Sequence, residues 1–383
     1  MTQQTILPGQ TIGILGGGQL GRMLAIAAKQ MGYRIAVLDP TEDCPCAQVA
    51  DVAIVADYDD PEAAKRMAEV ADVVTYEFEN VDVATVDYLQ AHSYLPQGGH
   101  LLEITKDRLN EKAAIRKAGL PVVPYLPVRN AEELQQAIAE IGFPSVLKTT
   151  EGGYDGKGQY VLKQEKDLEE ALPYIGNTPF ELEKWLPFDK EISVIVVRST
   201  AGKTSVFPVA ENIHQHNILH HTLVPARIEK ALHESATRYA LQLAEALHLV
   251  GTLAVEMFVG TDGKVYVNET APRPHNSGHF SINACETSQF EQHIRAICGL
   301  PLSSTALLKP VIMVNILGEH VQPVLDKIGQ MADAHLHLYG KEEARPGRKM
   351  GHLNILGATV DDAIAKAESL GIWKIEQEVG QHS

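Results

Sequence analysis

The sequence predicts a mixed fold: an α/β N-terminal domain built on a parallel sheet, followed by an α+β portion rich in antiparallel strands. Three observations predict it. Strand and helix patterns alternate with short connections over about the first 100 residues, which is typical of a parallel sheet with helices on both faces. Longer β patterns joined by turns dominate after residue 190. The chain has 383 residues, more than one hydrophobic core usually serves, so roughly two or three domains are expected.

The N-terminal elements are predicted from buried apolar runs and from the helix signals between them. Pro61 is expected to open a helix, because proline is tolerated in the first turn. In chain order we expect strand 11–15, helix 21–31, strands 34–38 and 52–56, helix 61–71 and strand 72–78. We expect this domain to span residues 1–104.

A small unit is predicted over residues 105–190, and a larger one over 191–383. The small unit begins with a linker helix at 107–118, which Gly119 and the prolines after it should end. It continues with helix 131–141, strands 145–150 and 159–163, helix 165–172 and strand 180–186. The larger unit should contain strands 190–198 and 204–210, helix 228–247, a hairpin at 252–271, strands 310–317, 335–340 and 351–356, and helix 360–370. Residues from about 300 onward are expected to form a terminal β-rich subdomain.

Composition and charge exclude several classes of protein. The chain is 45% hydrophobic and 21% charged, as in globular proteins, and no apolar run is long enough for a membrane span. A net charge of −16 argues against a nucleic-acid partner. The N-terminus lacks a signal-peptide pattern and the four cysteines are scattered, so we expect a cytoplasmic protein without a disulfide framework. An anionic substrate would need a local basic cluster, for which the candidates are Lys106, Arg108 and Lys112, or Lys341, Arg345, Arg348 and Lys349.

The first glycine-rich stretch, "ILGGGQLGR", follows a predicted strand. Gly16, Gly18 and Gly21 fit the G-x-G-x-x-G pattern, and Asp39 ends the next strand. That spacing is typical of dinucleotide-binding domains, in which the glycine amides contact a pyrophosphate and the acidic residue contacts a ribose. A Rossmann-like domain is therefore predicted, and an NAD-dependent dehydrogenase is one interpretation of it.

A second glycine-rich stretch, "TTEGGYDGKGQY", joins two β patterns instead of a strand and a helix. It is therefore neither a Walker loop nor a Rossmann turn. Its glycines allow amides to approach a phosphate, with Lys157 in the loop and Lys148 on the strand before it. This pattern favours a phosphate-covering lid; a flexible hairpin loop without a ligand is the alternative.

A β-hairpin with two facing carboxylates is the strongest signal of function. Asp262-Gly263 predicts a two-residue turn, and that register pairs Phe258 with Val267 and Glu256 with Glu269. Directly opposed carboxylates repel each other. A shared divalent cation is the economical explanation, and Mg²⁺ with ATP phosphates would suit these two residues and Asn268. The alternative is a protonated glutamate or a neighbouring lysine.

These features together resemble an ATP-grasp ligase, and five stretches match one of its families. They are "TYEFENV" (75–81), "GGYDGKGQ" (152–159), "ENIHQHNIL" (211–219), "NETAPRPHNSGH" (268–279) and "YGK…RPGRKMGH" (339–352). The family is 5-(carboxyamino)imidazole ribonucleotide synthase of purine biosynthesis, and the resemblance covers essentially the whole chain. It implies an ATP-grasp fold with an N-terminal Rossmann-like (preATP-grasp) domain, a small lid domain and a C-terminal β-rich portion.

The resemblance also implies roles for individual residues. The residues implied to bind ATP are Arg108, Lys148, Gly153, Tyr154, Asp155, Gly156, Lys157, Gly158, Gln159, Glu183, Lys184, Trp185, Leu186, Glu191, His214, Asn268 and Glu269, with residues 183–186 contacting adenine through backbone groups. Magnesium would be bound by Glu256, Glu269 and Asn268. The ribonucleotide substrate would contact Gln19, Glu77, Glu79, Tyr154, Arg273, His275, Lys341 and Arg348. The implied catalytic residues are Arg273, His275, Asn276, Lys157 and Asp155, with His275 a candidate base.

The implied reaction is the ATP-dependent carboxylation of aminoimidazole ribonucleotide with bicarbonate through carboxyphosphate, with ATP and Mg²⁺ as cofactors. The family implies a homodimer, and a separate mutase would act on the product. Close alternatives are a formate-dependent phosphoribosylglycinamide formyltransferase and a glycinamide ribonucleotide ligase. A module that binds ATP without turnover is a further alternative, as is the dehydrogenase named above.

Overall fold

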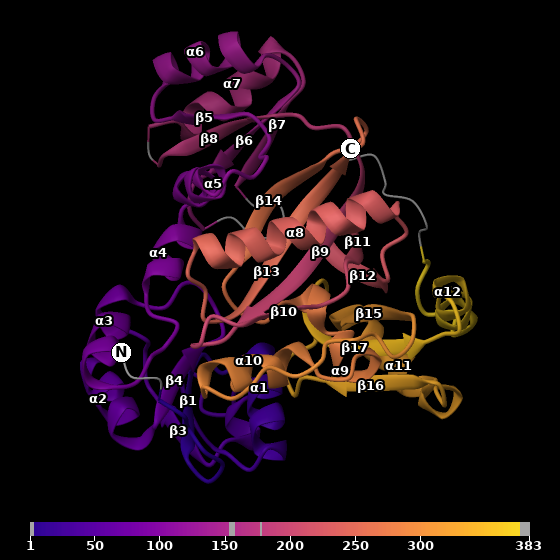
Figure 1. Cartoon of the computed structure of the whole chain (residues 1–383). Helices are drawn as coiled ribbons and strands as arrows, with labels where there is room; N and C mark the ends of the chain where they lie inside the picture. Colours follow the sequence, from indigo (N-terminus) through magenta and orange to yellow (C-terminus); the bar gives the residue numbers. More distant parts are fainter. Residues whose placement is uncertain (1–3, 153–157, 177, 376–383) are drawn as a thin grey trace.

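The computed structural model describes residues 4–152, 158–176 and 178–375. Figure 1 places a small domain at the top, the N-terminal domain at the lower left and the last strands of the chain at the lower right, around one large sheet. Among the described residues, no helix has the length and apolar content needed to cross a bilayer.

The N-terminal domain is a four-stranded parallel sheet with the strand order β3-β2-β1-β4. Its strands are β1 (Thr11–Leu15), β2 (Arg34–Asp39), β3 (Val52–Val55) and β4 (Val73–Tyr76), and its helices are α1 (Gln19–Gln30), α2 (Pro61–Val70) and α3 (Val83–His92). The alternation of strands and helices predicted this sheet correctly. Pro61 does open α2, with the Asp60 carboxylate accepting a hydrogen bond from the Glu62 N–H (2.9 Å).

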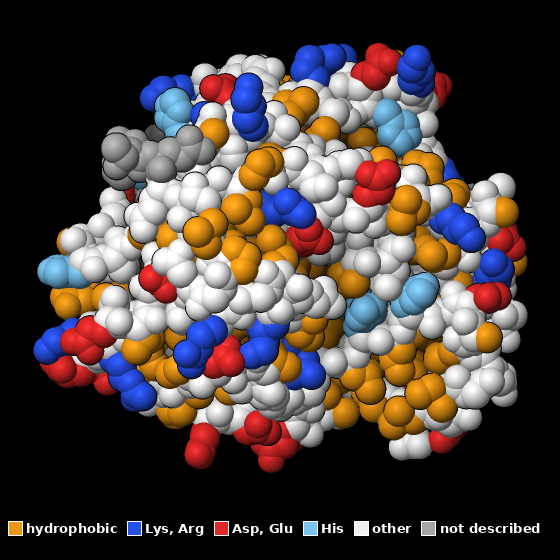
Figure 2. Space-filling model, turned by 60° about the horizontal axis from the view of Figure 1, so that its bottom comes forward, with side chains coloured by type: hydrophobic (Ala, Val, Ile, Leu, Met, Phe, Trp, Pro, Cys, Tyr) orange, Lys and Arg blue, Asp and Glu red, His pale blue; other side chains and the backbone are white. Residues whose placement is uncertain are grey.

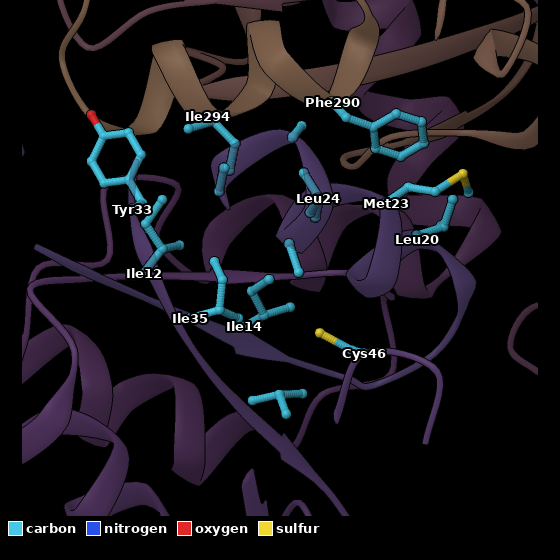
Figure 3. Packing of buried hydrophobic residues seen from close by; sticks show 14 of the residues in the cluster. Ile12, Ile14, Leu20, Met23, Leu24, Tyr33, Ile35, Cys46, Phe290 and Ile294 are labelled. Carbon is cyan, nitrogen blue, oxygen red and sulfur yellow. The ribbon is translucent and has the colours of Figure 1, made fainter. Parts of the chain in front are cut away.

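The core of this domain also contains residues from far along the chain. Ile12, Ile14 and Leu24 pack in one cluster with Phe290 and Ile294 of α10 (Gln289–Ile297), as Figure 3 shows. Since α1 rests on α10, the N-terminal domain is joined to the remainder by buried apolar surface and not only by the chain.

The linker helix predicted at 107–118 is α5, and a further helix that was not predicted, α4, precedes it. α4 (His100–Lys106) ends where α5 (Arg108–Lys117) begins, because Asp107 takes an extended conformation and its carboxylate accepts a hydrogen bond from the Asn110 N–H (2.9 Å). This cap fixes the start of α5, and therefore the position of Arg108.

The small domain carries a four-stranded antiparallel sheet, ordered β5-β8-β6-β7. The strands are β5 (Tyr125–Val128), β6 (Ser145–Thr149), β7 (Gln159–Leu162) and β8 (Phe180–Lys184), covered by α6 (Ala131–Ile141) and α7 (Leu168–Ala171). As predicted, the second glycine-rich stretch connects two adjacent antiparallel strands, β6 and β7.

The large sheet has nine strands, in the order β14-β13-β9-β11-β12-β15-β17-β16, with β10 paired to β9. Its strands are β9 (Phe188–Arg198), β10 (Thr204–Val206), β11 (Ala210–Gln215), β12 (Ile218–Val224), β13 (Gly251–Gly260), β14 (Val265–Ala271), β15 (Val311–Leu317), β16 (Ala334–Leu338) and β17 (Lys349–Leu356). The strands expected in a terminal subdomain therefore continue the central sheet through the β12–β15 pairing. The accompanying helices are α8 (Lys230–Ala246), α9 (Ser281–Ala284), α10, α11 (Val321–Asp326) and α12 (Val360–Ser369).

Figure 2 shows the face at the bottom of Figure 1, where hydrophobic side chains are interspersed with charged ones of both signs. This mixed surface is usual for globular proteins, in which much of the accessible area is apolar.

Candidate active site

A cavity of about 560 Å³ lies where the small domain, α5 and the large sheet meet. Twelve of the predicted site residues line it: Glu79, Arg108, Lys148, Gln159, Glu191, His214, Glu256, Asn268, Glu269, Arg273, His275 and Asn276. They come from segments that are far apart in the sequence, and the fold brings them to one place. The lining also includes Lys106 and Lys349, one from each candidate basic cluster, and Glu111, which the sequence did not assign to a site.

The facing glutamates were predicted correctly, although the predicted turn was wrong. The hairpin loop has three residues, because the Gly260 N–H donates to the Lys264 carbonyl (2.8 Å), and Phe258 consequently pairs with Tyr266 and not with Val267. A β-bulge between Glu256 and Met257 then shifts the register back by one residue, and Glu256 lies opposite Glu269. Bulges re-aim side chains in this way at functional sites.

The two carboxylates differ in their partners. The Arg108 guanidinium donates to Glu269 (Nη1–Oε2 3.0 Å), whereas the partner of Glu256 is the His275 ring (Nε2–Oε1 3.0 Å). Burial, together with the nearby Glu269 charge, raises the pKa of Glu256 to about 8. With both carboxyls ionised the hairpin would carry more negative charge than its neighbours neutralise, so Glu256 keeps its proton up to about pH 8.

These oxygen donors suit Mg²⁺. Glu256, Glu269 and the side-chain amide of Asn268 face one cavity, and Mg²⁺ prefers a few carboxylate oxygens supplemented by phosphate and water. Within the described ranges, no group of three or more His, Cys, Asp and Glu side chains is arranged to hold a metal ion. The set therefore fits a cation that shares its coordination with nucleotide phosphates.

Glu111 is a buried carboxyl that the sequence analysis missed. It accepts hydrogen bonds from the Thr270 N–H (2.5 Å) and hydroxyl (2.7 Å), directly after Glu269 on β14. Burial first, and then the Glu269 charge, raise its pKa to about 8. In the sequence it is simply a polar position in a helix, and only the packing of α5 on β14 brings it into the site.

Lys148 lies at the cavity within a buried network of charges. Its ammonium group contacts Glu183 (Nζ–Oε1 3.0 Å), and Lys112 contacts both Glu183 and Glu181 (Nζ–Oε1 of Glu181 2.7 Å). Burial and the neighbouring Lys112 charge lower the pKa of Lys148 to about 7. Lys112, proposed above as part of a surface cluster for an anionic substrate, is buried and neutralises these glutamates instead.

The residues expected to contact adenine, 183–186, lie beside the charge network, and their contact with adenine stays a prediction. The Glu183 side chain belongs to the charge network, and the amides of Lys184 and Trp185 donate to the carbonyls of Pro124 (2.9 Å) and Pro144 (3.1 Å). Glu183, Lys184, Trp185 and Leu186 are not among the described residues that line the cavity. Backbone engagement of this kind cannot be inferred from a sequence pattern.

His214 and Glu191 form a pair at the cavity wall (Nδ1–Oε2 2.8 Å). Burial would lower the pKa of His214, but the Glu191 carboxylate outweighs it and the pKa is raised. On the opposite side, Arg273 donates to Glu79 (Nη2–Oε1 2.8 Å), and Asn276 exchanges two hydrogen bonds with Asn315 of β15 (3.0 and 2.6 Å).

The first glycine-rich stretch contacts protein carboxylates. The N–H groups of Gly18 and Gly21 donate to Glu77, and the Gly17 N–H donates to Asp39 (2.7 Å). A Cβ added at Gly18 would lie 2.5 Å from the Glu77 Oε1 atom, so the glycine permits this close approach. The amides expected to contact a dinucleotide are thus satisfied within the domain, which removes the basis for the dehydrogenase.

Four predicted substrate residues lie outside the cavity. Gln19, Glu77, Lys341 and Arg348 are not among its described lining residues. Lys341 donates to the Lys349 carbonyl (2.8 Å), and burial lowers its pKa to about 8. Of the glycine-rich stretch predicted to form a lid, Gly153, Tyr154, Asp155, Gly156 and Lys157 lie outside the described residues, whereas Gly158 has φ +72° and Gln159 lines the cavity.

The fold and the cavity define an ATP-grasp protein, and comparisons with known families agree. The chain matches the ATP-grasp domain over residues 113–290, the ribonucleotide synthetase preATP-grasp domain over 9–105, and the phosphoribosylaminoimidazole carboxylase C-terminal domain over 311–366.

Individual proteins that are similar to this chain show which family of ATP-grasp proteins it resembles. The N5-carboxyaminoimidazole ribonucleotide synthase of Bacillus subtilis is 54% identical over 95% of this chain and 96% of its own. A crystal structure of an N5-carboxyaminoimidazole ribonucleotide synthetase in complex with ADP shares 62% identity, with a TM-score of 0.94 over 97% of this chain and 99% of its own. The Aspergillus clavatus enzyme, crystallised with ADP and 5-aminoimidazole ribonucleotide, shares 31% identity and a TM-score of 0.88 over 94% and 97%. The chain belongs to the N5-carboxyaminoimidazole ribonucleotide synthase family.

Proposed function

We propose that this protein uses ATP to carboxylate 5-aminoimidazole ribonucleotide with bicarbonate, giving 5-(carboxyamino)imidazole ribonucleotide, ADP and phosphate. The observation that carries the proposal is the pair of facing carboxylates, Glu256 and Glu269, in one cavity with Lys148, Arg273 and His275. This arrangement can hold a metal–triphosphate and a small anion side by side. Family membership supports the choice of substrates.

The chemistry explains why these residue types are needed. Bicarbonate is a weak electrophile, and transfer of the γ-phosphoryl group to it gives carboxyphosphate, from which phosphate leaves readily. Catalysis of phosphoryl transfer is largely positioning and charge stabilisation. Magnesium bound by Glu256, Glu269 and Asn268 would supply most of that positive charge. Arg108 and Lys148 would contact phosphate oxygens, and Arg273 would hold the bicarbonate-derived anion near the attacking amine.

The remaining assignments rest on this reaction. Glu191 and His214 would contact the nucleoside part of ATP, and the lid around Gly158 would exclude water from carboxyphosphate. Lys341 and Arg348 would bind the 5′-phosphate of the ribonucleotide. The protein would act in the cytoplasm as a homodimer, and a separate mutase would consume its unstable product.

The test measures ADP formation with each substrate omitted in turn. ADP release should require 5-aminoimidazole ribonucleotide and bicarbonate together. Formate replacing bicarbonate should not support it, and glycine with phosphoribosylamine should not either. ADP release that depends on formate would instead establish the transformylase, and ATP binding without phosphate release under any of these conditions would establish a binding module.

A further inference from the structure

Both ring nitrogens of His275 are engaged. Nε2 lies 3.0 Å from the Glu256 Oε1 atom. Nδ1 lies 2.9 Å from the Ser277 hydroxyl and 3.4 Å from the Ser277 N–H, which points at it because His275 caps the short helical turn 276–278. A neutral imidazole carries one proton, so one nitrogen must donate and the other must accept.

A row of buried hydroxyl and amide groups continues from Nδ1 into the large sheet. The Ser193 hydroxyl donates to Ser277 (2.8 Å), the Asn212 amide donates to Ser193 (2.9 Å), and the Thr222 hydroxyl donates to the Asn212 Oδ1 atom (3.0 Å). These four side chains are at most 2% exposed, so bulk solvent does not reach them. We call Thr222, Asn212, Ser193 and Ser277 the relay.

The relay has a direction. Each hydroxyl has one proton, and Asn212 presents its oxygen to Thr222 and its NH₂ group to Ser193. Ser193 therefore accepts from Asn212 and gives its own proton to Ser277. Ser277 is left with its proton for His275 Nδ1, which must accept it. The Ser277 N–H also requires Nδ1 to be an acceptor, independently of the hydroxyl, because a backbone N–H can only donate.

We propose that the relay fixes His275 as the neutral tautomer with its proton on Nε2, and that His275 in this form positions Glu256 and is not the base that accepts the proton of the substrate amine. With Nδ1 accepting from Ser277 and Nε2 donating to Glu256, the ring has no lone pair left for a substrate. Donors of this kind orient the carboxylates that bind metal ions. The consequence for magnesium rests on the proposed function, but the tautomer itself does not.

The strand pairing agrees with this arrangement. Ser193 lies on β9 and pairs directly with Glu256 of β13. Strand β9 therefore carries a member of the relay and is also a neighbouring strand of the carboxylate.

The tautomer can be measured without substrates by ¹⁵N NMR on protein labelled in its histidine rings, with His275→Gln identifying the signal. We expect Nε2 protonated and Nδ1 unprotonated in the ligand-free protein at neutral pH. A proton on Nδ1, or on both nitrogens, would overturn the proposal. Because this measurement needs no turnover, its failure is separate from a failure of the proposed function.

Asn212→Asp tests the relay itself. A carboxylate accepts from both Thr222 and Ser193, so the Ser193 proton turns away from Ser277 and the Ser193 oxygen becomes a second acceptor for the Ser277 hydroxyl. We expect the hydrogen bond from the Ser277 hydroxyl to Nδ1 to weaken, which changes the ¹⁵N chemical shift of Nδ1, while the ring proton stays on Nε2 because the Ser277 N–H still donates to Nδ1. Asn354→Asp is the matched control, since Asn354 is a fully buried amide on β17 whose NH₂ group donates to the His279 carbonyl (3.1 Å) and to the Asn283 side chain (2.8 Å), outside the relay. An unchanged Nδ1 chemical shift in folded Asn212→Asp protein would overturn the relay.

Metal binding tests the positioning role. Mn²⁺ binding in the presence of ADP, followed by electron paramagnetic resonance, should weaken by about tenfold in His275→Ala, which removes the donor to Glu256. His275→Gln, whose amide NH₂ group can occupy the place of Nε2–H, should recover most of that affinity. Equal losses in the two variants would contradict a role as donor.

Discussion

Replacement of Glu256 by glutamine should change how the stability of this protein depends on pH. Burial and Glu269 raise the pKa of Glu256 to about 8, against about 4.3 for an unperturbed glutamate. Between these values the folded state binds a proton that the unfolded chain has lost, so the free energy of unfolding falls as the pH rises through this window. From about pH 6 to about pH 8, the titration of this one carboxyl lowers the free energy of unfolding by about 2 kcal/mol.

Glu256→Gln keeps the shape of the side chain and removes the titration. As the pH rises from about 6 to about 8, the free energy of unfolding of the variant should therefore increase by about 2 kcal/mol relative to that of the wild type, measured by urea unfolding in EDTA. Glu103→Gln, at an exposed position of α4, should leave the pH slope unchanged. Parallel slopes for the wild type and Glu256→Gln would refute the argument that Glu256 keeps its proton up to about pH 8.

The same variant should lose activity as it gains stability. Magnesium-dependent ADP formation should fall by more than the roughly 10- to 100-fold that accompanies loss of a ligand's hydrogen-bond partner. Active sites commonly hold such groups at a cost in stability. Retained turnover in Glu256→Gln would separate the carboxylate from metal binding.

Three further outcomes are expected. Lys112→Met should lower the free energy of unfolding by about 3–5 kcal/mol in urea unfolding, because it leaves the buried Glu181 of β8 without its cation and Glu183 with Lys148 alone. Lys117→Met, on the exposed side of the same helix, should have little effect. Gly18→Ala should destabilise the N-terminal domain by about 1–3 kcal/mol in thermal unfolding, since its Cβ would lie 2.5 Å from the Glu77 carboxylate. Neither the wild type nor Gly18→Ala should bind NAD in calorimetry. ADP binding in EDTA should weaken as the pH rises through about 7, where Lys148 loses its proton, and Lys148→Met should remove that pH dependence in calorimetric titrations.

The sequence predicts best where the signal is local. Alternating patterns and turn residues were enough for the parallel sheet, for the position of the glycine-rich stretch between two strands and for the facing pair of Glu256 and Glu269. The three-residue loop and the bulge were both missed. Each shifts the register of the hairpin by one residue, and the two shifts cancel. A correct pairing at Glu256 thus followed from an incorrect turn at Asp262-Gly263.

Contacts between distant elements could not be predicted. Glu77 and Gly18 are 59 residues apart, and only the packed domain shows that a protein carboxylate accepts from the glycine amides. Glu111 and Lys112 sit in a helix whose pattern suggests solvent, yet both are buried because α5 lies between β14 and the small sheet. A helix position facing a buried carboxylate has the same sequence signature as one facing water.

The cations around the cavity are held by carboxylates before any substrate arrives. Arg108 pairs with Glu269, Lys148 with Glu183, and Arg273 with Glu79. This pairing is how a chain of net charge −16 can gather positive charge at one site, since each cation is stabilised by a neighbouring anion. The Arg108–Glu269 pair also links the two ligands that we propose, because a phosphate would take Arg108 as its partner and a metal ion would take Glu269. A metal and a triphosphate that arrive together would give both groups new partners at once.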